Sequence, residues 1–121
     1  KRALIIEDDE DLANIFAEAL RGIGFEAENA LDGKIAREKL NVGDAPFLIL
    51  LDMHLPHISG KDLLFEMKSN ERFANSWIII STADARLAEE FRDQVDFALI
   101  KPVQFGQLKG IAARLKPKTE L

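Results

Sequence analysis

Residues 47–52 of the chain read Phe-Leu-Ile-Leu-Leu-Asp, five apolar residues followed directly by one carboxylate. A run this short and this apolar is typical of a strand that is buried on both faces of a parallel sheet. Asp52 then stands at the carboxyl end of the strand, the edge at which open parallel sheets bind ligands. The sequence therefore predicts that Asp52 belongs to a functional site.

Four other strand patterns occur in the chain, and helical patterns separate all five. Strands joined through helices need crossover connections, so we predict an α/β fold with a five-stranded parallel sheet and helices on both faces. The predicted strands are residues 3–6, 25–30, 47–52, 77–81 and 95–100, and the predicted helical faces carry Leu12, Ile15, Phe16, Ala19, Leu20 and Ile23, then Ile35, Ala36 and Leu40, then Leu63, Leu64 and Met67, then Leu87, Ala88 and Phe91, then Phe105, Leu108, Ile111, Ala112 and Leu115.

The composition narrows the class of protein. A chain of 121 residues fits a single domain over 1–121, in which residues 116–121 are expected to form a tail or the start of a linker. A net charge of −5 argues against direct binding of nucleic acid. The absence of cysteine excludes disulfides and thiolate metal sites. No apolar run approaches the ~20 residues of a membrane span, and we expect a cytoplasmic protein with no membrane contact.

Polar residues follow four of the predicted strands. Glu7 and Asp8 follow the first, Asp52 ends the third, Thr82 follows the fourth, and Lys101 follows the fifth. A parallel sheet brings these four ends to one edge. Carboxylates gathered there repel one another unless a cation lies among them, and Mg²⁺ prefers carboxylate oxygens and water. An aspartate beside such an ion can attack phosphorus and form an aspartyl phosphate.

Four motifs in chain order carry a family resemblance. They read Ile-Ile-Glu-Asp-Asp at 5–9, Leu-Leu-Asp-Met-His-Leu-Pro-His-Ile-Ser-Gly at 50–60, Ser-Thr-Ala at 81–83 and Ile-Lys-Pro at 100–102. Together they resemble the receiver domains of two-component response regulators, the CheY-like superfamily, over Arg2 to about Leu115. The resemblance implies a doubly wound, flavodoxin-like fold with the strand order 2-1-3-4-5.

The resemblance also implies a phosphorylation site and a metal site. Asp52 would accept a phosphoryl group from the phosphohistidine of a sensor histidine kinase or of a phosphotransfer protein. Mg²⁺ would be bound by Asp52, by Asp8 directly, by Glu7 mainly through water, and by the backbone carbonyl of His54. The partners that the resemblance implies are a downstream protein or effector domain, to which such a domain signals, and a second copy of the chain in a homodimer; such a domain is not a turnover enzyme.

The remaining motif residues would handle the phosphoryl group. By resemblance, Lys101 pairs with Asp52 and then with the phosphoryl group, and the Thr82 hydroxyl moves to hydrogen-bond it. His54 and Asp84 would flank the phosphate and set the rate at which it is lost. The bond between Lys101 and Pro102 is expected to be cis.

Other interpretations stay open at this point. Asp8 to Asp11 could simply form a helix-capping acidic turn, and Asp52 and Thr82 could cap turns of their own. A pseudo-receiver would keep the fold as an interaction module without phosphate. A haloacid-dehalogenase-like phosphatase would need an acid in place of His54, and a flavodoxin-like FMN site would need a Ser/Thr-rich loop in place of the acidic cluster.

The chain also departs from the family. Ala98 occupies the place of the usual aromatic switch residue, three positions before Lys101, and Phe97 should face the opposite side of the sheet. The short spacing from Thr82 to Lys101 predicts a short or irregular fourth helix. The aromatic residues are expected to pack in the core or at its margin; they are Trp77 and the phenylalanines at 16, 25, 47, 65, 91 and 105.

Overall fold

The computed structural model contains a five-stranded sheet in the order β2-β1-β3-β4-β5, with each neighbouring pair parallel. The predicted strand order and direction are therefore confirmed. The structure describes residues 1–118. The elements are β1 (Arg2–Ile6), α1 (Glu10–Arg21), β2 (Glu26–Ala30), α2 (Gly33–Leu40), β3 (Leu48–Asp52), α3 (Gly60–Lys68), β4 (Trp77–Thr82), α4 (Ala85–Phe91), β5 (Phe97–Ile100) and α5 (Phe105–Arg114), with 3₁₀ turns η1 (Glu71–Phe73) and η2 (Arg92–Gln94).

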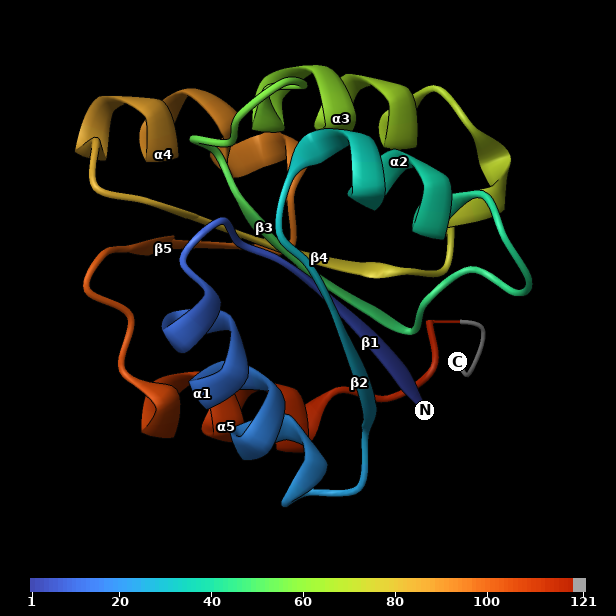
Figure 1. Ribbon diagram of the computed structural model, residues 1–121, viewed down its shortest axis with the longest axis vertical. Coiled ribbons are helices and arrows are strands. Elements are labelled where there is room, and N and C mark those ends of the chain that lie inside the picture. The colour runs from blue at the N-terminus through green and yellow to red at the C-terminus, as the bar shows by residue number, and fades with distance from the viewer. Residues whose placement is uncertain (119–121) are drawn as a thin grey trace.

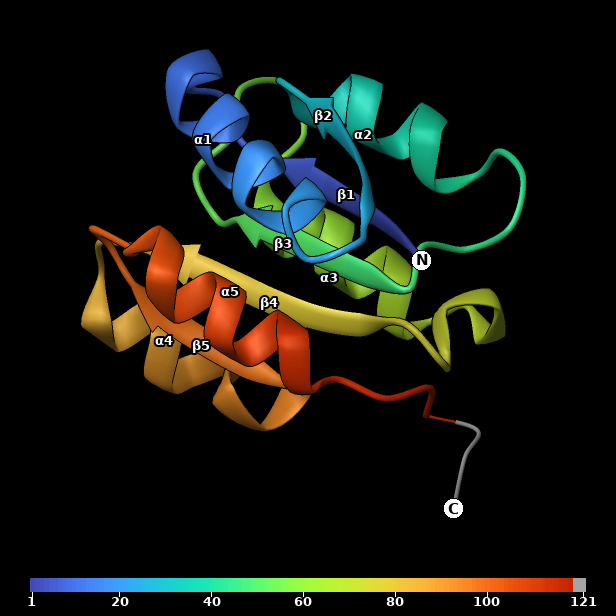
Figure 2. The same ribbon diagram turned by 90° about the horizontal axis from the view of Figure 1, so that it is seen from below.

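Helices cover both faces of the sheet, as Figure 1 and Figure 2 show: α1 and α5 lie on one face, and α2, α3 and α4 lie on the other. Each face has its own apolar cluster, because alternate residues of a strand point to opposite sides. Ile5 and Leu50 belong to the cluster beneath α1 and α5, whereas Ile6 and Leu51 belong to the cluster beneath the other three helices. The two clusters together bury most of the apolar side chains.

Strand β3 occupies the centre of the sheet between β1 and β4. All five of its residues are buried, including Asp52, which confirms that this run is a strand covered on both faces. The register pairs Asp52 with Ser81 and pairs Thr82 with Ile100. The carboxyl ends of these strands are thereby aligned at one edge.

Short polar side chains begin four of the helices. Asp9, Asp32, Ser59 and Asp84 each accept a hydrogen bond from a backbone N–H in the first turn of the helix that follows, at 3.1, 2.8, 3.1 and 2.9 Å. These bonds satisfy donors that have no partner within the helix. No helix among residues 1–118 is long and apolar enough to cross a membrane.

The fourth helix is short, as predicted. Helix α4 has only seven residues and runs into the 3₁₀ turn η2. Strand β5 begins at Phe97 rather than at the predicted Val95, because η2 and the two residues after it bring the chain to the sheet edge. Phe97 packs against the cluster of α1 and α5, and Ala98 packs against the other cluster, so their predicted opposite orientation is confirmed.

Four apolar residues that the sequence predicts in the core or at its margin are exposed in the structure. Ile15 is 48% exposed and Ile35 is 37% exposed, although both were assigned to buried helix faces. The buried stripe of α1 consists instead of Ala13, Phe16, Ala17 and Leu20, which turns Ile15 outward. Phe65 and Phe105 were expected in the core or at its margin, but they are 73% and 58% exposed because each lies on the outer side of its helix.

Gly60 allows the start of α3 to lie directly against the end of β3. A Cβ atom at this position would come within 2.5 Å of Met53 Cα and 2.7 Å of the Asp52 carbonyl oxygen. Overpacking of this kind costs about 1–3 kcal/mol. We therefore expect Gly60→Ala to lower the free energy of unfolding by about that amount in urea denaturation.

Gly110→Ala is the matched control. Gly110 lies within α5, and an added Cβ would meet nothing within 4 Å. Alanine is favoured over glycine inside a helix by about 0.5–1 kcal/mol, so this substitution should raise stability. Equal effects of the two substitutions would show that the close approach at Gly60 is unimportant.

Candidate functional site

The candidate site lies where four parallel strands end. Strands β1, β3, β4 and β5 carry Glu7, Asp52, Thr82 and Lys101 at or just beyond their carboxyl ends. The backbone N–H of Lys101 donates to the carbonyl of Thr82 at 2.8 Å, which extends the ladder between β4 and β5 to this edge. Residues that are 94 positions apart in sequence are thus brought into contact.

Three carboxylates form the acidic part of the site. An oxygen of each of Glu7, Asp8 and Asp52 lies within 4.8 Å of the others. Glu7 and Asp52 are each only 2% exposed, whereas Asp8 is open to solvent. Two of the carboxylates are therefore held away from water and close together, which is costly unless positive charge is nearby.

Lys101 supplies part of that positive charge. Its Nζ donates to Glu7 Oε1 at 3.0 Å and to Asp52 Oδ2 at 3.1 Å. Partial burial acts to lower the pKa of Lys101, but the hydrogen bonds to Glu7 and Asp52 outweigh it, and the pKa is raised above its ordinary value. Lys101 is accordingly a charged ammonium that bridges two buried carboxylates. Its peptide bond to Pro102 is cis, as the family resemblance implies.

Glu7 is the group whose protonation the site alters most clearly. Burial raises its pKa; the hydrogen bond from Lys101 lowers it, and the neighbouring Asp52 raises it again. The result is a pKa of about 7, against an ordinary value of 4.5. The backbone N–H of Asp9 also donates to the Glu7 carboxylate, at 3.2 Å.

The Asp52 side chain is held by hydrogen bonds on both of its oxygens. Oδ2 accepts from Lys101, and Oδ1 accepts from the backbone N–H of His54 at 3.0 Å. The next residue is fixed as well, because Met53 N–H donates to the carbonyl of Ser81 at 3.0 Å. Asp52 is thus oriented before any ligand arrives, as a positioned nucleophile requires.

Thr82 lies beside the acidic cluster and is in contact with two other residues expected at the site. Its fully buried hydroxyl oxygen accepts from the backbone N–H of Asp84 at 3.0 Å and lies 3.3 Å from His54 Nε2. The sequence does not predict the contact between Thr82 and His54, because no sequence signal connects the end of β4 with a loop residue 28 positions away. The exposed carboxylate of Asp84 caps α4.

The donor set fits a hard divalent cation. Three carboxylates face one ammonium, so negative charge remains in excess at the site. Oxygen ligands of this kind suit Mg²⁺, and the exposure of Asp8 leaves a side of the cluster open to water. His54 and His57 lie on the loop after β3, both exposed, and they do not belong to the carboxylate group.

Comparison with known proteins agrees with this geometry. Residues 3–113 match the response regulator receiver domain family. The chain is 31% identical to the chemotaxis protein CheY of Pseudomonas aeruginosa, over 98% of this chain and 93% of that protein. It is 30% identical to the probable methanogenesis regulatory protein FilR2 of Methanothrix harundinacea, over 93% of this chain and 79% of that protein.

Solved structures show the same fold. The response regulator TrrA of Thermotoga maritima, solved in complex with Mg²⁺-BeF, superposes with a TM-score of 0.80 at 26% identity and covers 93% of this chain and 96% of its own. Some relatives are longer: this chain spans 50% of RpaA of Synechocystis, a DNA-binding transcriptional regulator, and 18% of a putative transcriptional regulator of Haloferax volcanii. The chain belongs to the receiver domain family of two-component response regulators.

Proposed function

We propose that this chain is a phosphoacceptor receiver domain in which Asp52 takes a phosphoryl group from the phosphohistidine of a sensor histidine kinase or phosphotransfer protein. The single observation that carries the proposal is the Lys101 ammonium held at 3.0 and 3.1 Å between Glu7 and Asp52. This arrangement places positive charge beside an oriented, buried carboxylate, which is where a transferred phosphoryl group would develop negative charge.

The proposed transfer is a displacement at phosphorus. A carboxylate oxygen of Asp52 attacks the phosphorus, a new O–P bond forms, and the P–N bond to the donor imidazole breaks. The imidazole leaves with its electron pair and takes a proton from water. To end the signal, water attacks the same phosphorus, the O–P bond to Asp52 breaks, and the Asp52 carboxylate and inorganic phosphate are released.

Mg²⁺ is the cofactor that this site would hold. Asp8 and Asp52 would bind it, Glu7 would act mainly through water, and the backbone carbonyl of His54 would complete the protein ligands. When bound, the ion supplies positive charge that offsets the phosphoryl oxygens and the crowded carboxylates. Glu7 would give up its proton as the cation takes over part of the charge balance.

Lys101 and Thr82 would stabilise the transferred group. Lys101 already contacts Asp52 and would turn from a carboxylate oxygen to a phosphoryl oxygen. In the tautomer in which His54 Nε2 accepts from Thr82, the hydroxyl would have to leave His54 in order to donate to the same group. In that tautomer the contact between His54 and Thr82 opposes the phosphorylated state.

The output would pass through protein contacts. With a net charge of −5 the domain is poorly suited to bind nucleic acid, so an effect on DNA would require a downstream protein or effector domain. The proposal also includes a single receiver domain over 1–121, a cytoplasmic location and the ability to form a homodimer. A domain of this kind modifies itself and is not a turnover enzyme.

Incubation with Mg²⁺ and acetyl phosphate tests the proposal directly. Because Asp52 is the proposed nucleophile, intact mass should show one added phosphoryl group on the wild-type chain and none on Asp52→Asn. Removal of Mg²⁺ with EDTA should abolish the adduct. A wild-type chain that stays unmodified would favour a pseudo-receiver that acts only as an interaction module.

The contact between His54 and Thr82 predicts an effect on the lifetime of the phosphate. His54→Ala frees the Thr82 hydroxyl to contact the phosphoryl group, so the phosphoryl group should be lost more slowly, while Asp52 stays able to accept it. At Asp84 the test needs two variants, because the side chain also caps α4. Asp84→Asn keeps a capping side chain and removes the charge, whereas Asp84→Ala removes both. Phosphoryl lifetimes equal to wild type in all three variants would contradict these roles.

The raised pKa of Glu7 predicts how stability depends on pH in metal-free protein. The folded state holds the Glu7 proton up to a pKa of about 7, above the ordinary 4.5. This contribution to stability is complete below pH 4.5 and is lost as the pH rises through about 7. Relative to Glu7→Gln, the wild type should lose up to ~1.4 kcal/mol of unfolding free energy per pH unit in this window.

Chemical denaturation in EDTA at several pH values measures the difference between the two proteins. Mg²⁺ should restore the stability of the wild type at pH above 7, where Glu7 is ionised. Parallel pH profiles of wild type and Glu7→Gln would show that Glu7 titrates normally in the folded chain.

A further inference from the structure

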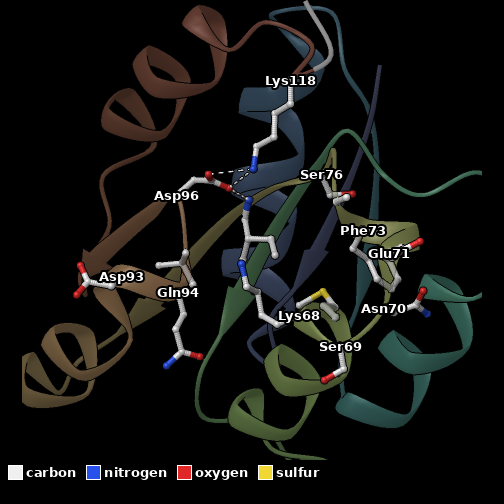
Figure 3. Close-up of a pocket in the computed structure, with 14 residues that line it drawn as sticks. Lys68, Ser69, Asn70, Glu71, Phe73, Ser76, Asp93, Gln94, Asp96 and Lys118 are labelled. Carbon is white, nitrogen blue, oxygen red and sulfur yellow. Dashed lines mark hydrogen bonds and ion pairs between the residues drawn. The ribbon is translucent and has the colours of Figure 1, made fainter.

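The segment after α5 is held against the amino-terminal end of β4, at the opposite end of the strands from the candidate site. The indole N–H of Trp77 donates to the carbonyl of Lys116 at 2.8 Å, and the Lys118 ammonium lies 4.7 Å from the centre of the Trp77 ring. Lys118 Nζ is also 3.0 Å from both carboxylate oxygens of Asp96. Figure 3 shows the side chain of Lys118 directed toward the carboxylate of Asp96. We call residues 116–118 the strap.

Asp96 joins the strap to the sheet. Its backbone N–H donates to the carbonyl of Ile78 at 2.9 Å, and its Oδ2 accepts from the N–H of Ile78 at 2.7 Å. The Asp96 and Lys118 side chains are only 23% and 25% exposed, so this ion pair is shielded more than an ordinary surface pair. Lys118 therefore attaches to the point where the chain enters β5.

Strand β5 connects the strap to the acidic site. It has four residues, with Asp96 immediately before it and Lys101 immediately after it. Both of these flanking residues are hydrogen-bonded to β4, through Ile78 and Thr82. Because β5 is an edge strand, it pairs with β4 alone and is held less firmly than the central strands. A displacement of Lys101 would therefore reach Asp96 through one strand of four residues.

We propose that phosphorylation of Asp52 loosens the strap by shifting β5 as Lys101 turns toward the phosphoryl group. This inference rests on the function proposed above and concerns how the same site is read. The route runs through the backbone of β5 and through Asp96, so it requires no aromatic side chain at Ala98. The segment after α5 then responds to phosphorylation of Asp52, although it lies at the opposite end of the strands from that residue.

The sole tryptophan of the chain reports on the strap, since Trp77 is covered by Lys116 and Lys118. We would measure acrylamide quenching of Trp77 with and without Mg²⁺ and beryllofluoride, in the wild type and in Lys118→Met. Lys116→Met is the matched control: it removes the same charge two positions away, from an exposed side chain, and keeps the carbonyl that accepts from Trp77.

The expected results follow from thermodynamic linkage. Beryllofluoride should raise quenching in the wild type toward that of an exposed indole, and Lys118→Met should show raised quenching without it. Because coupling is reciprocal, Lys118→Met should bind beryllofluoride more tightly by about fivefold, the lower end of typical coupling between sites. Lys116→Met should match the wild type in both measurements.

Two results overturn the inference, and intact mass after acetyl phosphate treatment tells them apart. If the wild type is phosphorylated but Trp77 quenching and the affinity of Lys118→Met stay unchanged, the strap is a static contact and the proposed function stands. If the wild type takes neither phosphate nor beryllofluoride, the proposed function fails and the coupling fails with it.

Discussion

The ammonium of Lys101 between Glu7 and Asp52 is the interaction on which the site depends. Two carboxylates that are each 2% exposed cannot both stay ionised at close range without a cation. The required charge comes from a residue 94 positions after Glu7, immediately beyond the last strand of the sheet. The strand order and register therefore serve the electrostatics of the site, because they bring Lys101 to the two acids.

The surroundings of Asp52 keep it oriented and accessible to chemistry. Lys101 and the backbone N–H of His54 hold its two oxygens, and Gly60 lets the next helix begin close behind it. The raised pKa of Glu7, about 7, reduces the repulsion between Glu7 and Asp52, because the protonated form of Glu7 carries no charge. The charges of Glu7, Asp52 and Lys101 thus balance one another in part. A divalent cation or a phosphoryl group would each change this balance, and Lys101 is the group that would move.

Much of the fold could be predicted because local patterns and sheet topology agree. The apolar run before Asp52 identified the central strand, and the crossover rule gave a parallel sheet. Patterns of apolar spacing were less reliable at helix edges: Ile15 and Ile35 are exposed, because alanines and leucines form most of the buried faces of α1 and α2 instead. Residue types at strand ends predicted which side chains meet, but the contact of Thr82 with His54 depends on loop geometry that no periodicity encodes.

The central claim is that Asp52, rather than a neighbouring acid, accepts the phosphoryl group. Hydride reduction of the acyl phosphate with borohydride, followed by peptide mass spectrometry, converts the modified aspartate to homoserine and so marks the residue itself. The account predicts homoserine at position 52 after treatment with acetyl phosphate and Mg²⁺. A reduced residue at Asp8 or Glu7 instead, or a phosphorylated chain with Asp52 unmarked, would contradict it.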